Sequence, residues 1–233
     1  LTGTLLSISG SLLVEAGTVV GDTTVDIDGN MTQSGGTFRG PPLLTLSGTW
    51  LRTGGAFDHN SGIVTLDGFT QTLSGSTTFY DLRKQVTQSA ALIIAAGTNQ
   101  AVSGALTLRG TFGEPLNIHT TQSGAQAELI LDTAVAANQS IQFVNVQDND
   151  AGSGAGLLCN DCTDSGNNVN WIFPTASISG ALYASDRTTP LASKTVAYAI
   201  GGGARISSGV TNAQGAYSVS GAALTPGDII TLY

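Results

Sequence analysis

The sequence predicts an all-β protein: a parallel β-helix, right-handed by default, with turns of about 19–21 residues, followed by a small C-terminal β-sandwich. Two observations predict this class. Short segments with two alternating apolar residues recur at a nearly constant spacing. Thr, Ser, Asn and Gly are abundant, whereas the Lys, Glu, Met and Arg that favour helices are scarce. With 41% apolar and only 10% charged residues, the chain has enough Val, Ile and Leu for an ordered core.

A repeated strand that ends in glycine gives the length of a turn. The segments are LSISG (6–10), VDIDG (25–29), LTLSG (44–48), VTLDG (64–68) and LTLRG (106–110). From one closing glycine to the next, the sequence number advances by 19, 19 and 20 and then by 42, which we interpret as two turns of 21. A second series, with glycines at 17, 36, 55, 75 and 97, runs in step with the first and gives Phe38, Phe57 and Phe79 equivalent places.

The two series together predict stacked turns. Alternating side chains point to opposite faces of a strand, and a unit of this length cannot bury its apolar face alone. Stacked units form a continuous core in which each backbone pairs with the turns before and after it. We expect the glycines to permit corners with positive φ. A sandwich or barrel would instead show regular hairpin turns and no unit repeat.

The repeats over residues 1–146 resemble those of bacterial surface proteins, such as filamentous-haemagglutinin-type adhesins and autotransporter passengers. The segment FDHNSGIVTLDGFTQTLSGSTTFYDL (57–82) is especially similar to repeats of large bacterial exoproteins. The resemblance implies an extracellular β-helix on a cell surface. It says little about activity, because one fold can carry many functions.

Residues 147–175 are predicted to close the β-helix, because the open end of a β-helix needs a cap. The segment resembles the closing segment of exoprotein repeat regions, and its Trp171 and Phe173 would cover the last turn. Cys159 and Cys162 form a lone C-x-x-C, without the further ligands of a zinc site or the helix of a thioredoxin motif. We therefore expect a local disulfide, which an extracellular compartment permits.

The same segment is rich in acidic residues. Hard cations prefer clustered oxygen ligands, so a calcium site is one interpretation, although the spacing is not that of an EF-hand. The other interpretation is a solvated loop with Asx turns. The candidate ligands are Asp148, Asp150, Asp161 and Asp164, and we expect no other cofactor.

Residues 176–233 predict a second, prealbumin-type or Ig-like sandwich domain. Its strand-like segments are SISGALYA, KTVAYAI, ARISSGVT, AYSVSG and DIITLY. GVTNAQGAYSVSG resembles the hairpin of carboxypeptidase-regulatory-like domains, in which Gly215 would supply the turn and Tyr217 the buried aromatic. The domain is shorter than the roughly 100 residues of a usual sandwich, so we expect it to be incomplete.

The triplet Asp58-His59-Asn60 is superficially similar to the W-I-D-H-N stretch of pectate lyases, in which Asp residues on adjacent turns hold Ca²⁺ and an Arg acts as base. Here Arg39 aligns with Asp58 one turn earlier. Asp67 aligns with Ser47 one turn earlier and with Asp28 two turns earlier. Arg109 also aligns with Asp67, but it lies two turns later. We expect no face to stack carboxylates on neighbouring turns, and we interpret the triplet as a solvated corner. We expect His119 to be exposed, without a nearby acid.

These observations predict a non-enzymatic extracellular structural protein, the rod of a bacterial surface adhesin or fibre. No G-x-S-x-G, H-E-x-x-H or phosphate-binding loop is present. A net charge of −8 disfavours nucleic-acid binding. The sequence contains no run of about 18 apolar residues, which a membrane-spanning helix would need. We expect Trp50, Tyr80 and Tyr183 to be exposed aromatics that make weak contacts.

Self-assembly is the sharper form of this hypothesis. The terminal strand of one copy would complete the sheet of the next and give a filament. The expected edge residues are Leu5, Leu6, Ile8, Ile229, Ile230, Leu232 and Tyr233. A cell-surface glycan or protein is the other expected partner, and both ends look cut from a longer chain. The alternative function is a carbohydrate-active β-helix, either a polysaccharide lyase or a glycan-binding module, with Asp and Arg stacked on one face.

Overall fold

The structure is a computed structural model that describes residues 5–174, 176–205, 207–222 and 228–233. The chain divides into two compact units, Leu1–Phe173 and Pro174–Tyr233. In the described residues, all regular structure is β except for one 3₁₀ helix, η1 (Thr133–Val135). None of these residues forms a helix long and apolar enough to cross a membrane.

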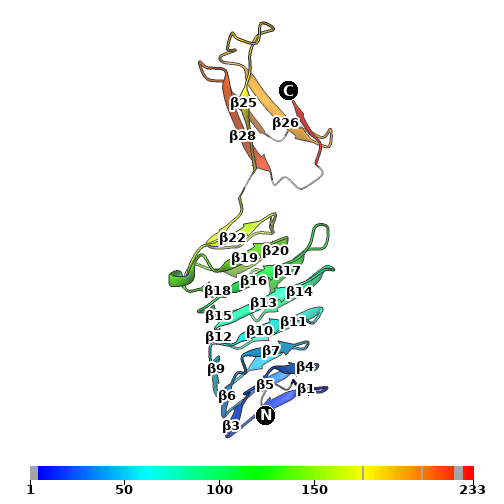
Figure 1. The fold of residues 1–233 in the computed structure, drawn as a ribbon, viewed down its shortest axis with the longest axis vertical. Coiled ribbons are helices and arrows are strands. Elements are labelled where there is room, and N and C mark those ends of the chain that lie inside the picture. Colours follow the sequence, from blue (N-terminus) through cyan, green and yellow to red (C-terminus); the bar gives the residue numbers. More distant parts are fainter. Residues whose placement is uncertain (1–4, 175, 206, 223–227) are drawn as a thin grey trace. The chain divides into compact units, whose positions relative to one another are not determined.

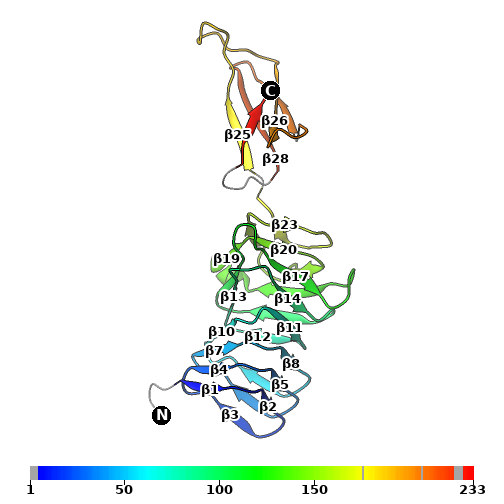
Figure 2. The ribbon, with the colours of Figure 1, turned by 90° about the vertical axis from the view of Figure 1, so that its right-hand side faces the viewer.

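The first unit is a parallel β-solenoid, as predicted, with strands on three sides of each turn (Figures 1 and 2). The first side is a nine-stranded sheet of β1 (Leu6–Ile8), β4 (Val25–Ile27), β7 (Leu43–Leu46), β10 (Ile63–Leu66), β13 (Asp81–Gln85), β16 (Leu106–Arg109), β19 (Gln139–Gln142), β22 (Leu157–Asn160) and β24 (Trp171–Ile172). The second is an eight-stranded sheet of β2 (Leu12–Val14), β5 (Met31–Gln33), β8 (Trp50–Arg52), β11 (Thr70–Ser74), β14 (Ala90–Ile94), β17 (Leu116–Thr120), β20 (Val144–Val146) and β23 (Thr163–Asp164).

The third side consists of two shorter parallel sheets. The first contains β3 (Thr18–Val20), β6 (Thr37–Arg39) and β9 (Ala56–Asp58), and the second contains β12 (Thr77–Phe79), β15 (Asn99–Val102), β18 (Ala127–Leu131) and β21 (Asn149–Asp150). Between β9 and β12 the Arg52 guanidinium donates hydrogen bonds to two carbonyls, Ser76 O at 2.8 Å and Gly55 O at 2.9 Å. A side chain therefore joins the two turns where the ladder is interrupted.

The register of the first side confirms the spacing of the early turns. Leu6 pairs with Val25, Val25 with Leu44, and Leu44 with Val64, so the sequence number advances by 19, 19 and 20 from turn to turn.

The later turns differ from the prediction. Val64 pairs with Leu82 and Leu82 with Leu106, so the steps are 18 and 24 rather than two of 21. The next turn, from Leu106 to Gln139, is longer still and includes η1. The parallel strands also continue past residue 146, the expected end of the repeats, through β23 and β24. Corners can lengthen or shorten because they lie outside the ladder that fixes the register.

The two glycine series have different roles. Those of the second series lie at corners with φ between 61° and 78°, as predicted, a conformation that costs glycine little. Those of the first series do not have positive φ, but after Gly10 each lies so close to the backbone of a neighbouring turn that a Cβ atom would clash with it. A Cβ atom at Gly48, for example, would be 2.3 Å from the carbonyl oxygen of Gly29.

Aromatic side chains fill the core of the first turns. The rings of Phe38 and Phe57 have centroids 5.7 Å apart, and those of Phe57 and Phe79 are 6.1 Å apart. Trp50 packs against the same cluster, and its Nε1 donates a hydrogen bond to Thr77 Oγ1 at 3.1 Å. The expectation that Trp50 is exposed is wrong, because it pairs with the buried Met31 at an inward-facing position. Tyr80 and Tyr183 are exposed, as expected.

The second unit contains small antiparallel sheets. β25 (Ala176–Ala181) pairs with β28 (Ala216–Ala222), and β26 (Thr195–Ile200) pairs with β27 (Ser207–Val210) and β29 (Ile230–Leu232). The predicted hairpin is therefore not formed within one sheet, since β27 and β28 belong to different sheets. Gly215 does lie in the turn, with φ of 73°. Tyr217 is only half-buried, and Tyr198 is the fully buried aromatic instead.

A lysine lies inside the solenoid. Lys84 occupies an inward position of β13, paired with Leu108, and its side chain is 0% exposed. Its Nζ donates hydrogen bonds to Gly68 O and Gln71 Oε1, both at 2.7 Å. Gln71 in turn donates to two corner carbonyls, Leu46 O and Gly48 O. Burial lowers the pKa of Lys84 from 10.5 to about 8, although the nearby Asp67 carboxylate opposes part of the shift.

This lowered pKa predicts a pH-dependent stability. Between about pH 8 and pH 10.5 the unfolded chain keeps the proton that folded Lys84 has released. The free energy of unfolding should therefore rise with pH across this window, by up to about 1.4 kcal/mol per pH unit. We expect the stability of the wild type relative to Lys84→Met, measured by urea unfolding, to increase from pH 8 to pH 10.5. Arg83→Met, on the outward side of the same strand, should show a constant difference; a constant difference for Lys84→Met would contradict the assignment.

Candidate functional site

The Asp58-His59-Asn60 corner is held by its own side chains. Asp58 Oδ1 accepts a hydrogen bond from the Asn60 N–H at 3.0 Å, and His59 Nδ1 accepts one from the Ser61 N–H at 3.1 Å. Asn60, with φ of 48°, accepts from Arg39 Nη2 at 2.7 Å, and Arg39 also lies 3.6 Å from Asp58. These side chains stabilise a turn in which Asn is favoured, as the solvated-corner interpretation predicts.

The predicted alignment of Asp67 with Ser47 on the preceding turn is correct. Its carboxylate accepts a hydrogen bond from Ser47 Oγ on the preceding turn, at 2.8 Å. The strand register places Gln85 on the next turn and pairs Gln85 with Arg109. Arg109 instead donates to Gln142 Oε1 at 2.6 Å. Asp67 and Arg109 therefore do not form one site.

The four aspartates of the suggested calcium site do not converge. Asp150 accepts from the Gly152 N–H, Asp161 from Gln142, and Asp164 from the Gly166 N–H and Asn168. In the described part of the chain, no three His, Cys, Asp or Glu side chains are placed to hold a metal ion. The calcium prediction is therefore not supported by the geometry.

Asp148 occupies a corner with φ of 57°. Hydrogen bonds from Asn167 Nδ2 at 2.7 Å and from the Gly124 N–H at 3.0 Å hold the pKa of its carboxyl below the usual range. His119 contributes a smaller electrostatic effect in the same direction. The expectation that His119 is exposed and has no acid nearby is therefore wrong in both parts, since His119 is half-buried in β17 and acts on Asp148.

Two carboxylates do lie in register on neighbouring turns, contrary to expectation. Glu128 of β18 pairs with Asp150 of β21. The two residues are 22 positions apart in the sequence, so the 19-residue spacing does not align them. Ser153 Oγ donates a hydrogen bond to Glu128 Oε1 at 3.2 Å, which ties the following loop to β18.

That loop forms one wall of a shallow groove on the third side of the solenoid. The groove has a volume of about 290 Å³. It is lined by Thr78, Ala101, Val102, Ser103, Ile130, Asp132, Thr133, Ser153 and Gly154. The Asp132 carboxylate and the hydroxyl groups of four Ser and Thr residues border a small floor. The sequence does not predict this site, because its residues come from four successive turns of unequal length.

The edge of the first turn exposes apolar side chains. Leu5 is 59% and Leu6 53% exposed, while Ile8 is half-buried against the core. With Val20 and Val25, the two leucines line a cavity of about 390 Å³ that opens at this edge. β1, β2 and β3 each stand at the end of a sheet, with one side of the strand unpaired in the described chain.

The final strand is a second edge. β29 pairs only with β26 among the described strands. Its apolar side chains and those beside it are largely exposed: Ile229 72%, Ile230 40%, Leu232 46% and Tyr233 51%. The Arg205 guanidinium lies 4.9 Å from the centre of the Tyr233 ring and covers part of it.

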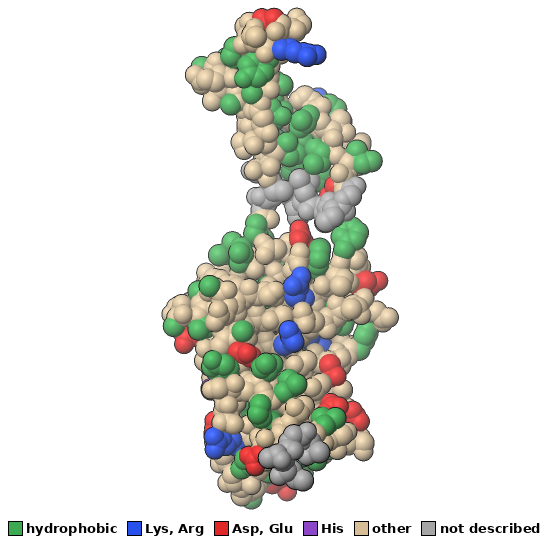
Figure 3. Space-filling model, viewed as in Figure 1, with side chains coloured by type: hydrophobic (Ala, Val, Ile, Leu, Met, Phe, Trp, Pro, Cys, Tyr) green, Lys and Arg blue, Asp and Glu red, His purple; other side chains and the backbone are tan. Residues whose placement is uncertain are grey.

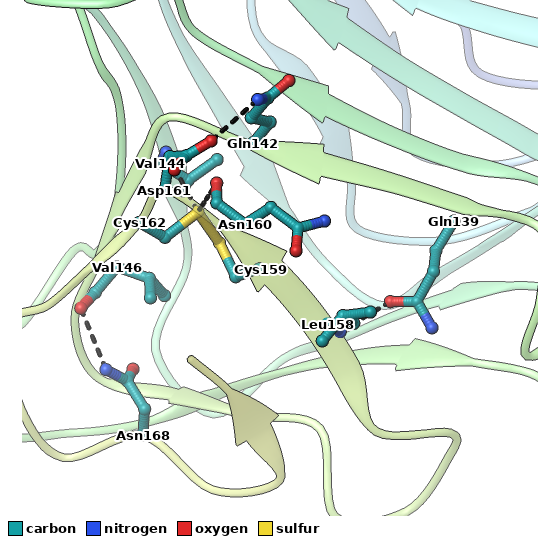
Figure 4. The surroundings of a disulfide bond; sticks show 10 residues. All are labelled: Gln139, Gln142, Val144, Val146, Leu158, Cys159, Asn160, Asp161, Cys162 and Asn168. Carbon is teal, nitrogen blue, oxygen red and sulfur yellow. Dashed lines mark hydrogen bonds between the residues drawn. A yellow bond between two sulfur atoms is a disulfide. The ribbon is translucent and has the colours of Figure 1, made fainter. Parts of the chain in front are cut away.

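Cys159 and Cys162 form a disulfide that joins the end of β22 to the start of β23 (Figure 4). A hydrogen bond from Gln142 Nε2 to Asp161 Oδ2 at 2.9 Å holds the same corner to the preceding turn, and one from the Leu158 N–H to Gln139 Oε1 at 2.8 Å holds the start of β22 (Figure 4). The last corners of the solenoid are therefore cross-linked both covalently and by side chains.

Trp171 and Phe173 lie at the closing end of the solenoid. Trp171 pairs with Leu157 through β24, is 8% exposed, and donates from Nε1 to the buried Asn149 Oδ1 at 2.8 Å. Phe173 stacks on it with a centroid distance of 6.4 Å and packs against the core. Asn149 also donates to Ala127 O, so the indole completes a buried polar contact as well as covering apolar side chains.

The chain matches no protein-family model, no curated protein and no solved structure.

Removal of the closing indole should destabilise the solenoid. Trp171→Ala creates a cavity and leaves Asn149 Oδ1 unpaired, so we expect a loss of about 3–5 kcal/mol in the free energy of unfolding, measured by urea titration. Ile172→Ala in the same strand is the control; Ile172 is 50% exposed, and the loss there should be about 0.5 kcal/mol or less. Equal losses in the two variants would contradict a closing role for Trp171.

Proposed function

We propose that this chain is a non-enzymatic extracellular structural protein, the β-helical rod of a bacterial surface adhesin or fibre. The observation that carries the proposal is the continuity of the solenoid: nine strands of one sheet stack in sequence order, and at about 4.8 Å per strand they span about 38 Å. Backbone hydrogen bonds between all successive turns make such a unit stiff, as a spacer requires.

The surface and the cross-links agree with this role. The face in Figure 3 is mostly covered by uncharged polar side chains and backbone, with few Lys, Arg, Asp and Glu. A disulfide between Cys159 and Cys162 persists in an oxidising compartment and not in a reducing cytosol. The resemblance of the repeats to bacterial exoproteins points to the same location.

Exposure at the cell surface is the expected result of a direct test. Antibodies raised against the solenoid should label intact cells of the source organism, and protease added outside the cells should remove the label. Labelling that requires permeabilised cells would overturn the proposal. A cytoplasmic protein of the same cells serves as the permeability control.

We also propose that the exposed first turn and β29 join copies end to end. Among the described strands, both are edges with one side unpaired, and both expose apolar side chains, which are the features that β-strand addition uses. Because the two edges differ from each other, repeated contacts would extend into a filament instead of closing as a dimer.

The association can be tested by introducing one charged side chain at the exposed edge of the first turn. Sedimentation velocity of the purified chain should show oligomers that grow with concentration, and electron microscopy should show filaments. Leu6→Lys should shift the distribution to monomers. Phe69→Lys should not, because Phe69 is 64% exposed but belongs to neither edge. Monomers of the wild type at all concentrations would exclude the association and leave the surface location untouched.

A further inference from the structure

The groove on the third side is built from the solenoid itself. Thr78, Ala101 and Ile130 form its floor, and the strand register places them side by side on β12, β15 and β18. All three face outward, and because Ala101 is small, a hollow remains between its larger neighbours. Strands of a parallel sheet fix these positions rigidly, as a binding site requires.

Hydrogen bonds hold both walls in place. On one side Asp132 follows β18, and its N–H donates to Val102 O at 2.9 Å, while its Oδ1 accepts from the Ala134 N–H at 2.8 Å. On the other side Ala155 N–H donates to Leu131 O at 2.8 Å and draws the loop over β18. A Cβ atom at Gly154 would be 2.4 Å from Leu131 O, so this close approach requires glycine.

The polar groups in the groove suit a ligand rich in hydroxyls. Thr78 and Thr133 supply hydroxyl groups that can donate and accept hydrogen bonds. The hydroxyls of Ser103 and Ser153 donate to Phe79 O and Glu128 Oε1 and can accept from a ligand. Asp132 is exposed, and its Oδ2 accepts no hydrogen bond within the described chain, so it is available to a donor. The Ala101 and Ile130 side chains lie side by side and add an apolar surface to the floor.

Charge narrows the class of ligand. No Lys, Arg or His lines the groove, whereas Asp132 lies in it and Glu128 and Asp150 stand beside it. The chain as a whole carries a net charge of −8. An anionic ligand would therefore be repelled. The volume of about 290 Å³ is at the lower limit of small-molecule sites, so the groove admits a short part of a longer chain.

We infer that this groove binds a sugar unit without negative charge, presented by a polysaccharide or a glycoprotein glycan. Asp132 accepts hydrogen bonds from neighbouring hydroxyls of the sugar, the Ser and Thr hydroxyls complete the contacts, and one ring face lies on Ala101 and Ile130. This binding does not depend on the surface location or the end-to-end association proposed above. Because the groove is shallow and open to solvent, a single sugar unit should bind weakly. Several copies of the protein that bind one polysaccharide would bind it more tightly through multivalency.

The inference can be tested with the full chain and a panel of oligosaccharides. We would use tetrasaccharides of glucose, mannose and N-acetylglucosamine as neutral probes and tetragalacturonate as the acidic one. Saturation-transfer NMR should detect at least one neutral probe and not the acidic one, and titration of amide shifts should place the contact on β12, β15 and β18. Released glycoprotein glycans and neutral plant or bacterial polysaccharides, compared in the same assay, would distinguish the two sources.

Matched variants decide whether the groove is the site. Ala101→Phe fills the floor and should weaken binding at least tenfold. Ala91→Phe is the control, since Ala91 is also an outward-facing, half-buried alanine in the middle of a sheet, on the second side of the solenoid. Asp132→Asn retains the acceptor that caps η1 but removes the charge, and it should also weaken binding.

Three results would overturn the inference: no probe binds, only the acidic probe binds, or Ala101→Phe binds as well as Ala91→Phe. Thermal unfolding of each variant shows whether it is folded. If Ala101→Phe fails to fold, Asp132→Asn and the amide-shift map still decide the outcome.

Discussion

The hydrogen bonds between successive turns are the interaction on which the rest of the solenoid depends. Within strands, the parallel ladder satisfies the backbone. At the corners the chain bends, and carbonyl groups that face inward have no partner in the ladder. Buried amides of a neighbouring turn bind them: Gln33 donates to Ala56 O at 2.8 Å, and Gln100 to Gly75 O at 2.9 Å. An unpaired buried acceptor costs about 1–3 kcal/mol, and in the described chain Gln33 Oε1 and Gln100 Oε1 themselves have no partner. The two amides therefore hold the corners in place between turns, at some cost in stability.

The sequence predicts the architecture because its two determinants are local. Alternation defines which side chains face inward, and the spacing of corner glycines defines the length of a turn. The prediction misplaces Trp50 because it assigns aromatic residues to the surface by type and not by their place in the alternation. The same alternation, counted from Leu82, places Lys84 inside. The groove is beyond such a prediction, since its floor residues Thr78, Ala101 and Ile130 follow one another at unequal intervals that no repeat defines.

Variation in turn length is what gives this solenoid distinct surfaces. The first turns have nearly equal lengths and smooth sides, and their corners are short. The long turn from Leu106 to Gln139 adds η1, and the loop that contains Ser153 is a corner of the next turn, which advances by only 18 residues from Ile141 to Cys159. Both raise walls above an otherwise flat sheet. A loop inserted at a corner does not disturb the ladder, so the core and the surface can change independently. The Asp58 corner belongs to the smooth part, where side chains are occupied in stabilising the bend.

The Lys84–Gln71 contact has a consequence for the order in which turns assemble. Turns that bury only Leu, Ile and Val are nearly interchangeable, so a folding chain that skips one turn would lose little packing energy. The Lys84 ammonium distinguishes the correct neighbour, because among the turns described here Gln71 Oε1 and Gly68 O together lie only on the one before it. Stacked on another turn, the charge would be buried among aliphatic side chains, at a cost of several kcal/mol. One polar residue thereby marks a unique position in a repetitive core, and specificity of stacking is gained at the expense of some stability.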